Sequence, residues 1–263
     1  MTASPESLEI AGEDGIRFAQ VTDCHLMDEP DGRLRGINTR ATLEAVLESI
    51  GNNHPQLDFL LFTGDISQTG SRASYGIFAS ALASLSCPVY CIPGNHDDPA
   101  GLHDIIPTSP VSELRTIPLG TNRLQLLTSW IAGKHHGRIS DACLRRLGRQ
   151  LSRPPGGMDI IALHHPPVAT GCWLDGMGLV NRADLYGELA KVSQPTLLLC
   201  GHIHQTIDRQ FGNTRVLTAP STCYQFKPGA ATMTVDETRT PGYRYIHIES
   251  PHRVHTRVYH LAH

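Results

Sequence analysis

Short runs of aliphatic and β-branched residues, each bounded by turn-forming residues, recur along the chain and predict buried strands. We expect strands at residues 16–22, 59–63, 89–92, 124–128, 159–163, 196–200, 214–218, 243–248 and 254–259. Apolar residues with helical spacing lie between several of these runs. They predict helices at residues 38–50, 71–85, 140–151 and 182–192.

The order of these elements indicates a fold class. Strands alternate with helices early in the chain, whereas strands with few helices follow late, which predicts an α/β layered fold with a mostly antiparallel C-terminal part. The 263 residues are 40% hydrophobic, enough for one sizeable core. The Pro/Gly stretch at residues 153–157 is too short to separate domains. We therefore expect a single domain over residues 1–263.

Charge and cysteine content exclude several classes of function. The formal net charge is -3, so no basic face indicates a nucleic acid polymer or an anionic membrane as partner. The polar, acidic N-terminus and the absence of a run of about 18 apolar residues argue against a secretory signal or a membrane-spanning helix. The seven cysteines are scattered without a CxxC pair, which favours the cytoplasm over a disulfide-bonded secreted protein.

Five of the predicted strands end in Asp, Asn or His. These ends read Asp23-Cys24-His25, Gly64-Asp65, Gly94-Asn95-His96-Asp97, His164-His165-Pro166-Pro167 and Gly201-His202-Ile203-His204. Because sites assemble at the carboxyl ends of strands in open α/β sheets, we expect one polar cluster there. Buried charges need partners or a metal ion, so the cluster predicts a metal centre.

Spacing within the strand ends suggests which residues share an ion. Residues i and i+2 of an extended chain share a face, so Asp23 and His25 are expected to reach the same ion. The same geometry would let His202 and His204 approach a site together. Glycines 64, 94 and 201 precede the candidate ligands, where the backbone must turn sharply beside another segment.

The number of candidate ligands indicates two ions. The candidates are Asp23, His25, Asp65, Asn95, His164, His202 and His204, too many for one four-coordinate zinc. They suit two ions about 3.5–4 Å apart that share a carboxylate, an arrangement used for phosphoryl hydrolysis. Asp65 stands alone in its segment and is the expected bridge. The lack of thiolate ligands favours Fe²⁺ or Mn²⁺, with Zn²⁺ as the alternative.

The order DxH, GD, GNHD, HHPP and GHxH resembles the calcineurin-like metallophosphoesterases. It is most similar to the bacterial 3′,5′-cyclic AMP phosphodiesterases, the class III cyclic-nucleotide phosphodiesterases. The resemblance covers roughly residues 10–245 and includes QVTDCHLM, LRGINT, GCWLDGMGLVN, LLLCGHIHQ and APSTCYQFKPG. It implies a four-layered α/β-β/α sandwich with the metal site at the carboxyl ends of the strands.

The resemblance also implies residue roles. One ion would be held by Asp23, His25, Asp65 and His204, and the other by Asp65, Asn95, His164 and His202. The substrate phosphate would contact His25, Asp65, Asn95 and His96. His96 would stabilise or protonate the leaving oxygen, and with Asp65 it forms the expected catalytic pair.

One departure from the wider superfamily narrows the substrate. Protein phosphatases usually read GDxxDRG at the second motif, whose arginine binds phosphate, whereas residues 64–70 read GDISQTG. We therefore expect a two-metal phosphodiesterase that converts 3′,5′-cyclic AMP to 5′-AMP and lowers intracellular cyclic nucleotide. The alternatives are a broader phosphodiesterase for 2′,3′-cyclic nucleotides or glycerophosphodiesters, and a non-catalytic scaffold. The scaffold is disfavoured because every candidate ligand and His96 are present.

Four further residues have two interpretations each. His165 either supports the ligands from behind or only packs beside the prolines, with support favoured. Asp97 either orients His96 or caps a following turn. Trp173 could stack on a nucleobase or be buried packing. Lys227 could contact substrate, although a solvated lysine is expected.

Overall fold

Two sheets form the centre of the protein. The computed structural model describes residues 15–112, 114–153 and 156–262. One sheet has the order β13 (Arg253–His260), β12 (Gly242–Ser250), β1 (Ile16–Val21), β4 (Phe59–Phe62), β5 (Val89–Cys91). The other has the order β10 (Asp208–Phe211), β11 (Thr214–Thr218), β9 (Thr196–Cys200), β8 (Asp159–Leu163), β7 (Asn122–Leu126), β6 (Arg115–Leu119). A separate short hairpin pairs β2 (Arg33–Leu34) with β3 (Ile37–Asn38).

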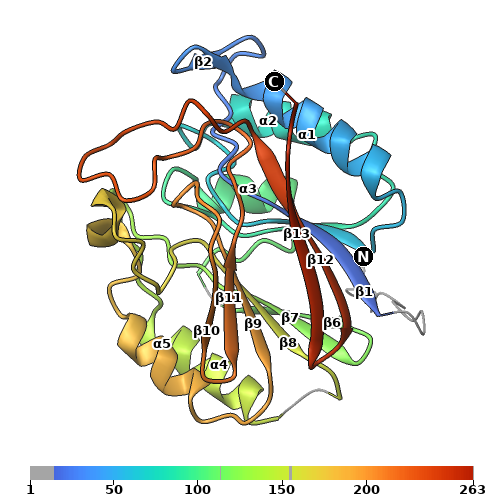
Figure 1. Cartoon of the computed structure of the whole chain (residues 1–263), viewed down its shortest axis with the longest axis vertical. Helices are drawn as coiled ribbons and strands as arrows, with labels where there is room; N and C mark the ends of the chain where they lie inside the picture. The colour runs from blue at the N-terminus through green and yellow to red at the C-terminus, as the bar shows by residue number, and fades with distance from the viewer. Residues whose placement is uncertain (1–14, 113, 154–155, 263) are drawn as a thin grey trace.

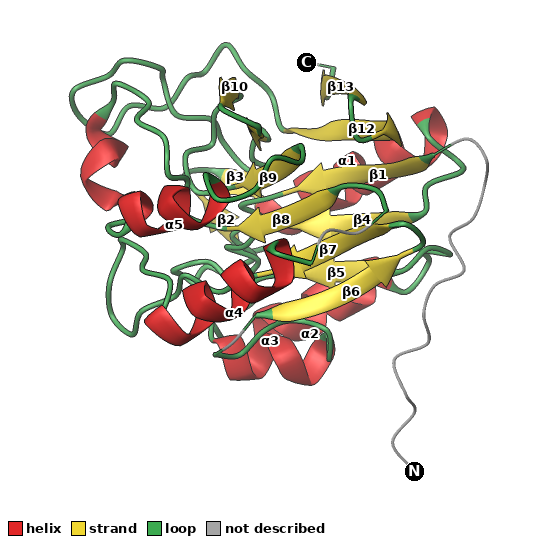
Figure 2. Ribbon diagram, turned by 90° about the horizontal axis from the view of Figure 1, so that it is seen from below, coloured by secondary structure: helices red, strands yellow, loops and turns green. Residues whose placement is uncertain are grey.

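Helices cover the outer face of each sheet. Helices α1 (Thr39–Asn53), α2 (Arg72–Leu82) and α3 (Pro99–Ile105) share a buried apolar cluster with β1, β4 and β5. Helices α4 (Asp141–Leu151) and α5 (Arg182–Leu189) share another with β8, β9 and β11. Figure 1 shows the strands between these two groups of helices, and Figure 2 shows α4 and α5 in front of the strands. The expected four-layered α/β-β/α sandwich is confirmed.

The strand sequences are apolar on both faces because both faces are buried. In β1, Phe18 belongs to the cluster between the sheets, whereas Ala19 belongs to the cluster under α1 and α2. In β8, Ile160 faces the other sheet and Ile161 faces α4 and α5. This period of two is the strand alternation, and it accounts for the continuous hydrophobic runs in the sequence.

Parallel pairing brings the functional strand ends to one edge. Strands β1, β4 and β5 run parallel in one sheet, and β7, β8, β9 and β11 run parallel in the other. The predicted ligands follow the carboxyl ends of β1, β4, β5, β8 and β9.

Two buried polar side chains join the sheets: Gln20 donates to the Cys200 carbonyl (2.8 Å), and Arg244 donates to the carbonyls of Thr218 (2.8 Å) and Ile207 (3.0 Å).

All nine predicted strands and four predicted helices are present, with no end shifted by more than three residues. The sequence did not reveal β6, because Pro118 interrupts it, nor β10, because all four of its residues are exposed. Both are edge strands, where such residues are tolerated. The antiparallel C-terminal part is confirmed for β10–β11 and β12–β13, but β11 is parallel to β9. Within the described residues, no helix is long and apolar enough to span a membrane.

We predict that Arg244→Ala lowers the free energy of unfolding by about 2–4 kcal/mol, because it removes buried charge-assisted hydrogen bonds between the sheets. Arg244 is 2% exposed. Denaturant unfolding followed by circular dichroism measures the change. The matched control is Arg257→Ala, which removes an exposed arginine from the adjacent strand β13 and should cost no more than about 1 kcal/mol. Equal losses in both variants would contradict the inter-sheet role of Arg244.

Candidate metal centre

Strained backbone marks the candidate site. Asp23, His25, Asp65, His202 and His204 have φ values of 54°, 49°, 51°, 71° and 46°, in the left-handed region. This conformation costs a non-glycine residue about 1–3 kcal/mol and persists only where surrounding contacts fix it. The only other non-glycine residue with positive φ in the described part of the chain is Arg35. The strain therefore coincides with five of the predicted ligands.

This backbone corrects the expectation that residues i and i+2 would act together on an extended chain. Asp23 and His25 do lie in one group, but His202 and His204 point to different groups. The ring of His204 lies beside Asp23, with Nε2 3.3 Å from Oδ1. The ring of His202 lies 5.2 Å from that of His164 between centroids. Alternation along a strand does not apply here because these residues are left-handed rather than extended.

The first group consists of Asp23, His25 and His204, whose candidate ligand atoms all lie within 4.8 Å of one another. All three residues are buried. Contacts behind each ring leave Nε2 pointing inward: His25 Nδ1 lies 2.8 Å from Oε1 of Gln68, and His204 Nδ1 donates to the Tyr224 carbonyl at 2.7 Å. Metal-binding histidines are typically oriented in this way through the second ring nitrogen.

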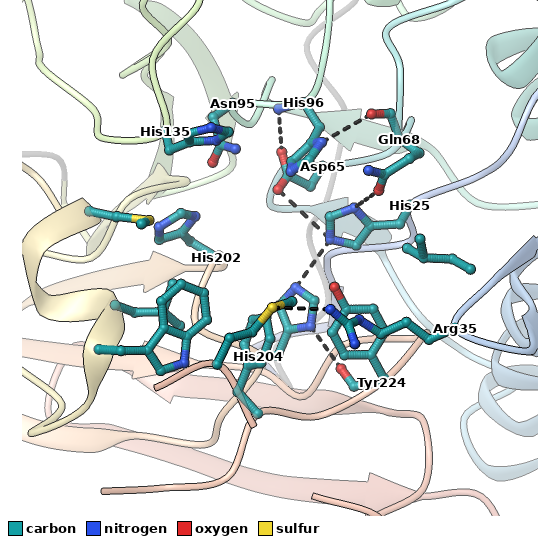
Figure 3. A pocket seen from close by; sticks show the side chains of 16 residues that line it. His25, Arg35, Asp65, Gln68, Asn95, His96, His135, His202, His204 and Tyr224 are labelled. Atoms are coloured by element: carbon teal, nitrogen blue, oxygen red, sulfur yellow. Dashed lines mark hydrogen bonds and ion pairs between the residues drawn. The ribbon is translucent and has the colours of Figure 1, made fainter. Parts of the chain in front are cut away.

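We take Asp65, Asn95, His164 and His202 as the second group, because His164 lies close to both Asp65 and His202, and Asn95 lines the same cavity as Asp65 and His202. Oδ2 of Asp65 lies 3.4 Å from Nε2 of His164 and 3.9 Å from Nε2 of His25, so this carboxylate adjoins both groups. His164 is oriented by a 2.7 Å hydrogen bond from Nδ1 to the Thr63 carbonyl. Figure 3 shows Asp65 and His25 side by side, with His202 and Asn95 facing the same space.

Unpartnered buried atoms show that these residues fit a metal ion. Among the residues that the structure describes, Nε2 of His164, Nε2 of His202 and Oδ1 of Asn95 are buried without a hydrogen-bond partner. A buried polar atom without a partner costs about 1–3 kcal/mol. Two imidazole nitrogens, an amide oxygen and a nearby carboxylate form a donor set that divalent Fe, Mn or Zn accepts. A cation between them would satisfy all three atoms at once.

The protonation states of the residues around Asp65 also indicate a metal ion. Burial opposes ionisation of Asp65, but the neighbouring histidines, His164 foremost, hold its pKa well below the usual range. Burial also opposes protonation of His164, but the attraction and hydrogen bond of the Asp65 carboxylate outweigh this effect and raise the His164 pKa to about 9. Burial lowers the pKa of His25 to about 4, so its ring is neutral, and its Nε2 lies 3.1 Å from Nε2 of His204. Protonated His164 thus offsets the charge of Asp65, a role that a metal ion would take over as it displaces the proton.

His96 lies beside the groups with its ring held by the chain. Its backbone N–H donates to Oδ1 of Asp65 at 2.9 Å, and its ring Nδ1 donates to the Gln68 carbonyl at 3.0 Å. The ring stands edge-on to His25, with centroids 4.9 Å apart, and lines the cavity described below (Figure 3). With Nδ1 engaged, Nε2 is the nitrogen of His96 that remains for chemistry.

Asp97 has a different role from either alternative raised by the sequence. Its carboxylate accepts hydrogen bonds from the backbone N–H groups of Gly94, Ile66 and Ser67 at 2.8, 3.2 and 3.0 Å. The helix that follows, α3, is capped by Asp98 instead. Asp97 is 4% exposed, and burial raises its pKa to about 6. It therefore joins the loop that carries Asp65 to the loop that carries Asn95 and His96.

His165 lies behind the ligands. Its nitrogens lie close to those of His164 and His202, a grouping that could in principle hold an ion. Both are already engaged, however: Nδ1 with the Ser129 hydroxyl at 2.7 Å and Nε2 with the His135 carbonyl at 3.1 Å. Its ring centroid is 4.6 Å from that of His202. A supporting position thus fits His165 better than a place among the ligands.

A cavity of about 290 Å³ opens above the two groups. Trp173 lines it and packs edge-on against Phe226, with centroids 5.1 Å apart; its stacking on a nucleobase stays a prediction. Lys227 is exposed and is not among the lining residues, as expected for a solvated lysine. Sequence reasoning missed Arg35 and Tyr224 as lining residues, although both lie in motifs, LRGINT and CYQF, that carried the family resemblance.

Comparison with known proteins identifies the family. The calcineurin-like phosphoesterase family matches residues 16–206. The 3′,5′-cyclic adenosine monophosphate phosphodiesterase CpdA of Escherichia coli K12 is 37% identical over 258 residues, covering 97% of this chain and 94% of the relative. CpdA of Pseudomonas aeruginosa is 36% identical over 249 residues, with 94% and 91% covered. A 3′,5′-cyclic-nucleotide phosphodiesterase of Nostoc sp. is 36% identical over 232 residues, with 88% and 87% covered.

Solved structures agree on the fold. A dimetal phosphatase from Danio rerio superposes with a TM-score of 0.66 at 14% identity, over 92% of this chain and 98% of that one. A purple acid phosphatase from yellow lupin gives 0.65 at 13% identity, over 92% and 51%. The family match and the near full-length relatives together show that the chain belongs to the calcineurin-like phosphoesterase family, whose fold implies a dinuclear metal site.

Proposed function

We propose that this chain hydrolyses 3′,5′-cyclic AMP to 5′-AMP at a site that holds two divalent cations. The observation that carries the proposal is the convergence of two groups of buried ligand atoms, one on each side of Asp65, below a single cavity. The similarity to CpdA proteins over nearly the whole chain supports the substrate. All seven cysteines are free, which suits action on cyclic nucleotide in the cytoplasm.

We assign the ligands as the two groups suggest. One cation would be held by Asp23, His25, Asp65 and His204, and the other by Asp65, Asn95, His164 and His202. The donor set favours Fe²⁺ or Mn²⁺, with Zn²⁺ as the alternative. When bound, such cations lower the pKa of water from 15.7 towards about 7 and neutralise charge on the phosphoryl oxygens. The substrate phosphate would lie against His25, Asp65, Asn95 and His96.

His96 is assigned to the leaving group. Water adds to phosphorus and loses a proton, the bond from phosphorus to O3′ breaks, and a proton from Nε2 of His96 goes to O3′; the proton that water loses restores His96 for the next turnover. The Gln68 carbonyl accepts a hydrogen bond from Nδ1 of His96 at 3.0 Å, which holds the ring and leaves Nε2 for the leaving group. The Asp65 carboxylate, which accepts the His96 backbone N–H, fixes the loop relative to the ligands. The Asp97 carboxylate accepts hydrogen bonds from the backbone N–H groups of Gly94 and Ser67, and so holds the two loops together.

We predict that Asp65→Ala loses metal occupancy and hydrolysis together, because this carboxylate adjoins both ligand groups. Metal content after reconstitution with Mn²⁺ and the rate of 5′-AMP formation measure the two effects. Asp104→Ala, an exposed carboxylate on α3, is the matched control and should change neither. A fully metallated, active Asp65→Ala enzyme would refute the bridging role.

We predict that His96→Gln keeps its metal but lowers kcat for cyclic AMP by about 10²–10⁴-fold, the usual contribution of a general acid. The loss should be much smaller for a diester with a nitrophenolate leaving group, because that group departs without a proton. His252→Gln, an exposed histidine outside the site, serves as control. Equal losses on both substrates would exclude proton donation by His96, and loss of metal would place it among the ligands.

We predict that 3′,5′-cyclic AMP has the highest kcat/KM in a panel with 3′,5′-cyclic GMP, 2′,3′-cyclic AMP, glycerophosphodiesters and an aryl diester. The Mn²⁺- or Fe²⁺-loaded enzyme is the form to assay. Comparable rates across the panel would favour the broader phosphodiesterase, and no turnover by the metallated protein would favour the non-catalytic scaffold.

A further inference from the structure

Arg35 occupies a turn position that does not suit an arginine. Arg35 and Gly36 form the two-residue loop between β2 and β3, and their φ values are 53° and 84°. Hairpin turns with positive φ at both central positions favour Asn, Asp or Gly, because other side chains are strained there. Gly36 meets this demand, whereas Arg35 does not. Such strain, when tolerated, tends to occur at functional positions.

The hairpin holds Arg35 at the rim of the cavity. Leu34 and Ile37, which flank the turn, pack against the apolar cluster that contains Tyr224 and Phe226. The cavity is lined by Leu34 and Arg35 together with those two aromatic residues. The hairpin is therefore anchored on its apolar side, and its tip presents the guanidinium to the cavity.

The guanidinium of Arg35 is available for a ligand. Its Cζ atom lies 5.6 Å from the centroid of the Tyr224 ring, and Nη2 lies 3.0 Å from the sulfur of Met233. In the described part of the chain, no carboxylate forms an ion pair with it, and no other arginine or lysine lines the cavity. Figure 3 shows Arg35 over Tyr224, at the end of the cavity away from Asn95 and His96.

The two ends of the cavity differ in chemistry. His96, Asp65 and Asn95 lie at one end, where the proposed function places the phosphate. Figure 3 shows Tyr224 beside Arg35 and His204, apart from His96 and Asn95. Trp173 and Phe226 also line the cavity, and Nε1 of Trp173 is buried without a hydrogen-bond partner among the described residues. A phosphate bound at the polar end directs the base of a nucleotide towards the aromatic end.

We propose that Arg35 is a specificity-determining residue whose guanidinium stacks on the purine base of the substrate, in the part of the cavity walled by Trp173, Tyr224 and Phe226. The planar, weakly hydrated guanidinium stacks on aromatic faces, which a lysine ammonium does not do. The inference rests on the proposed function, because it takes the phosphate end from it. It adds a contact with the base that the metal centre cannot provide.

The test distinguishes a contact of Arg35 with the base from a contact with the phosphate and from an effect on the stability of the turn. Arg35→Asn removes the guanidinium but places a residue that suits positive φ at the turn, so thermal stability should not fall. Arg35→Lys keeps the charge and removes the plane. Arg40→Ala, at an exposed arginine paired with Glu44 on α1, is the matched control. The substrates are 3′,5′-cyclic AMP and the abasic ribose 3′,5′-cyclic phosphate, assayed with the metal-loaded enzyme.

We expect Arg35→Asn to raise KM for cyclic AMP by about 3- to 30-fold, the range of cation–π contacts, with kcat/KM for the abasic substrate unchanged. Arg35→Lys should lose most of the same discrimination, and Arg40→Ala none. Equal losses on both substrates would place Arg35 on the phosphate and overturn the proposal. No loss on either substrate would overturn it as well.

A binding measurement separates this inference from the proposed function. Calorimetry compares 5′-AMP with ribose 5-phosphate for the wild type and Arg35→Asn, without turnover. We expect the wild type to prefer 5′-AMP and Arg35→Asn to lose that preference. A wild type without this preference overturns the base contact, even if cyclic AMP is hydrolysed. A preference of the wild type for 5′-AMP that Arg35→Asn loses supports the base contact, even if another diester is the better substrate. A preference that Arg35→Asn keeps overturns it.

Discussion

The structure depends on the burial of two carboxylates, Asp23 and Asp65, at the junction of two sheets. Both are almost without solvent contact, at 0% and 2% exposure. Buried charges of the same sign need a compensating charge, and the chain supplies imidazole rings around them. Three further buried polar atoms nearby, on Asn95, His164 and His202, form no hydrogen bond with the described residues. A pair of divalent cations would offset the charges of the two carboxylates and bind these three atoms.

The loops are built to hold this arrangement. Five of the proposed ligands adopt left-handed backbone conformations, and each costs about 1–3 kcal/mol. Glycines remove steric conflicts at two points: a Cβ atom on Gly64 would collide with the His164 ring, and one on Gly94 would collide with Asp65. Asp97 then joins the two loops through three backbone N–H groups. The site is thus fixed by contacts between segments rather than by any one strand.

Much of the fold and the ligand set could be predicted from the sequence, for identifiable reasons. Fully buried strands leave continuous apolar runs, and Asp, Asn or His after such a run stands out. What failed were inferences that needed contacts between distant segments. The left-handed conformation of His202 and His204 depends on neighbouring loops, so the extended geometry by which they were expected to approach a site together does not apply to them. The position of Arg35 depends on Met233 and Tyr224, almost two hundred residues away.

The most direct test is anomalous diffraction from crystals of the protein reconstituted with Mn²⁺. Our account predicts two peaks for each chain. One should contact Asp23, His25 and His204, the other Asn95, His164 and His202, with Asp65 touching both. A single peak, or a metal that leaves the nitrogens of His164 and His202 without a bond, would contradict the dinuclear centre.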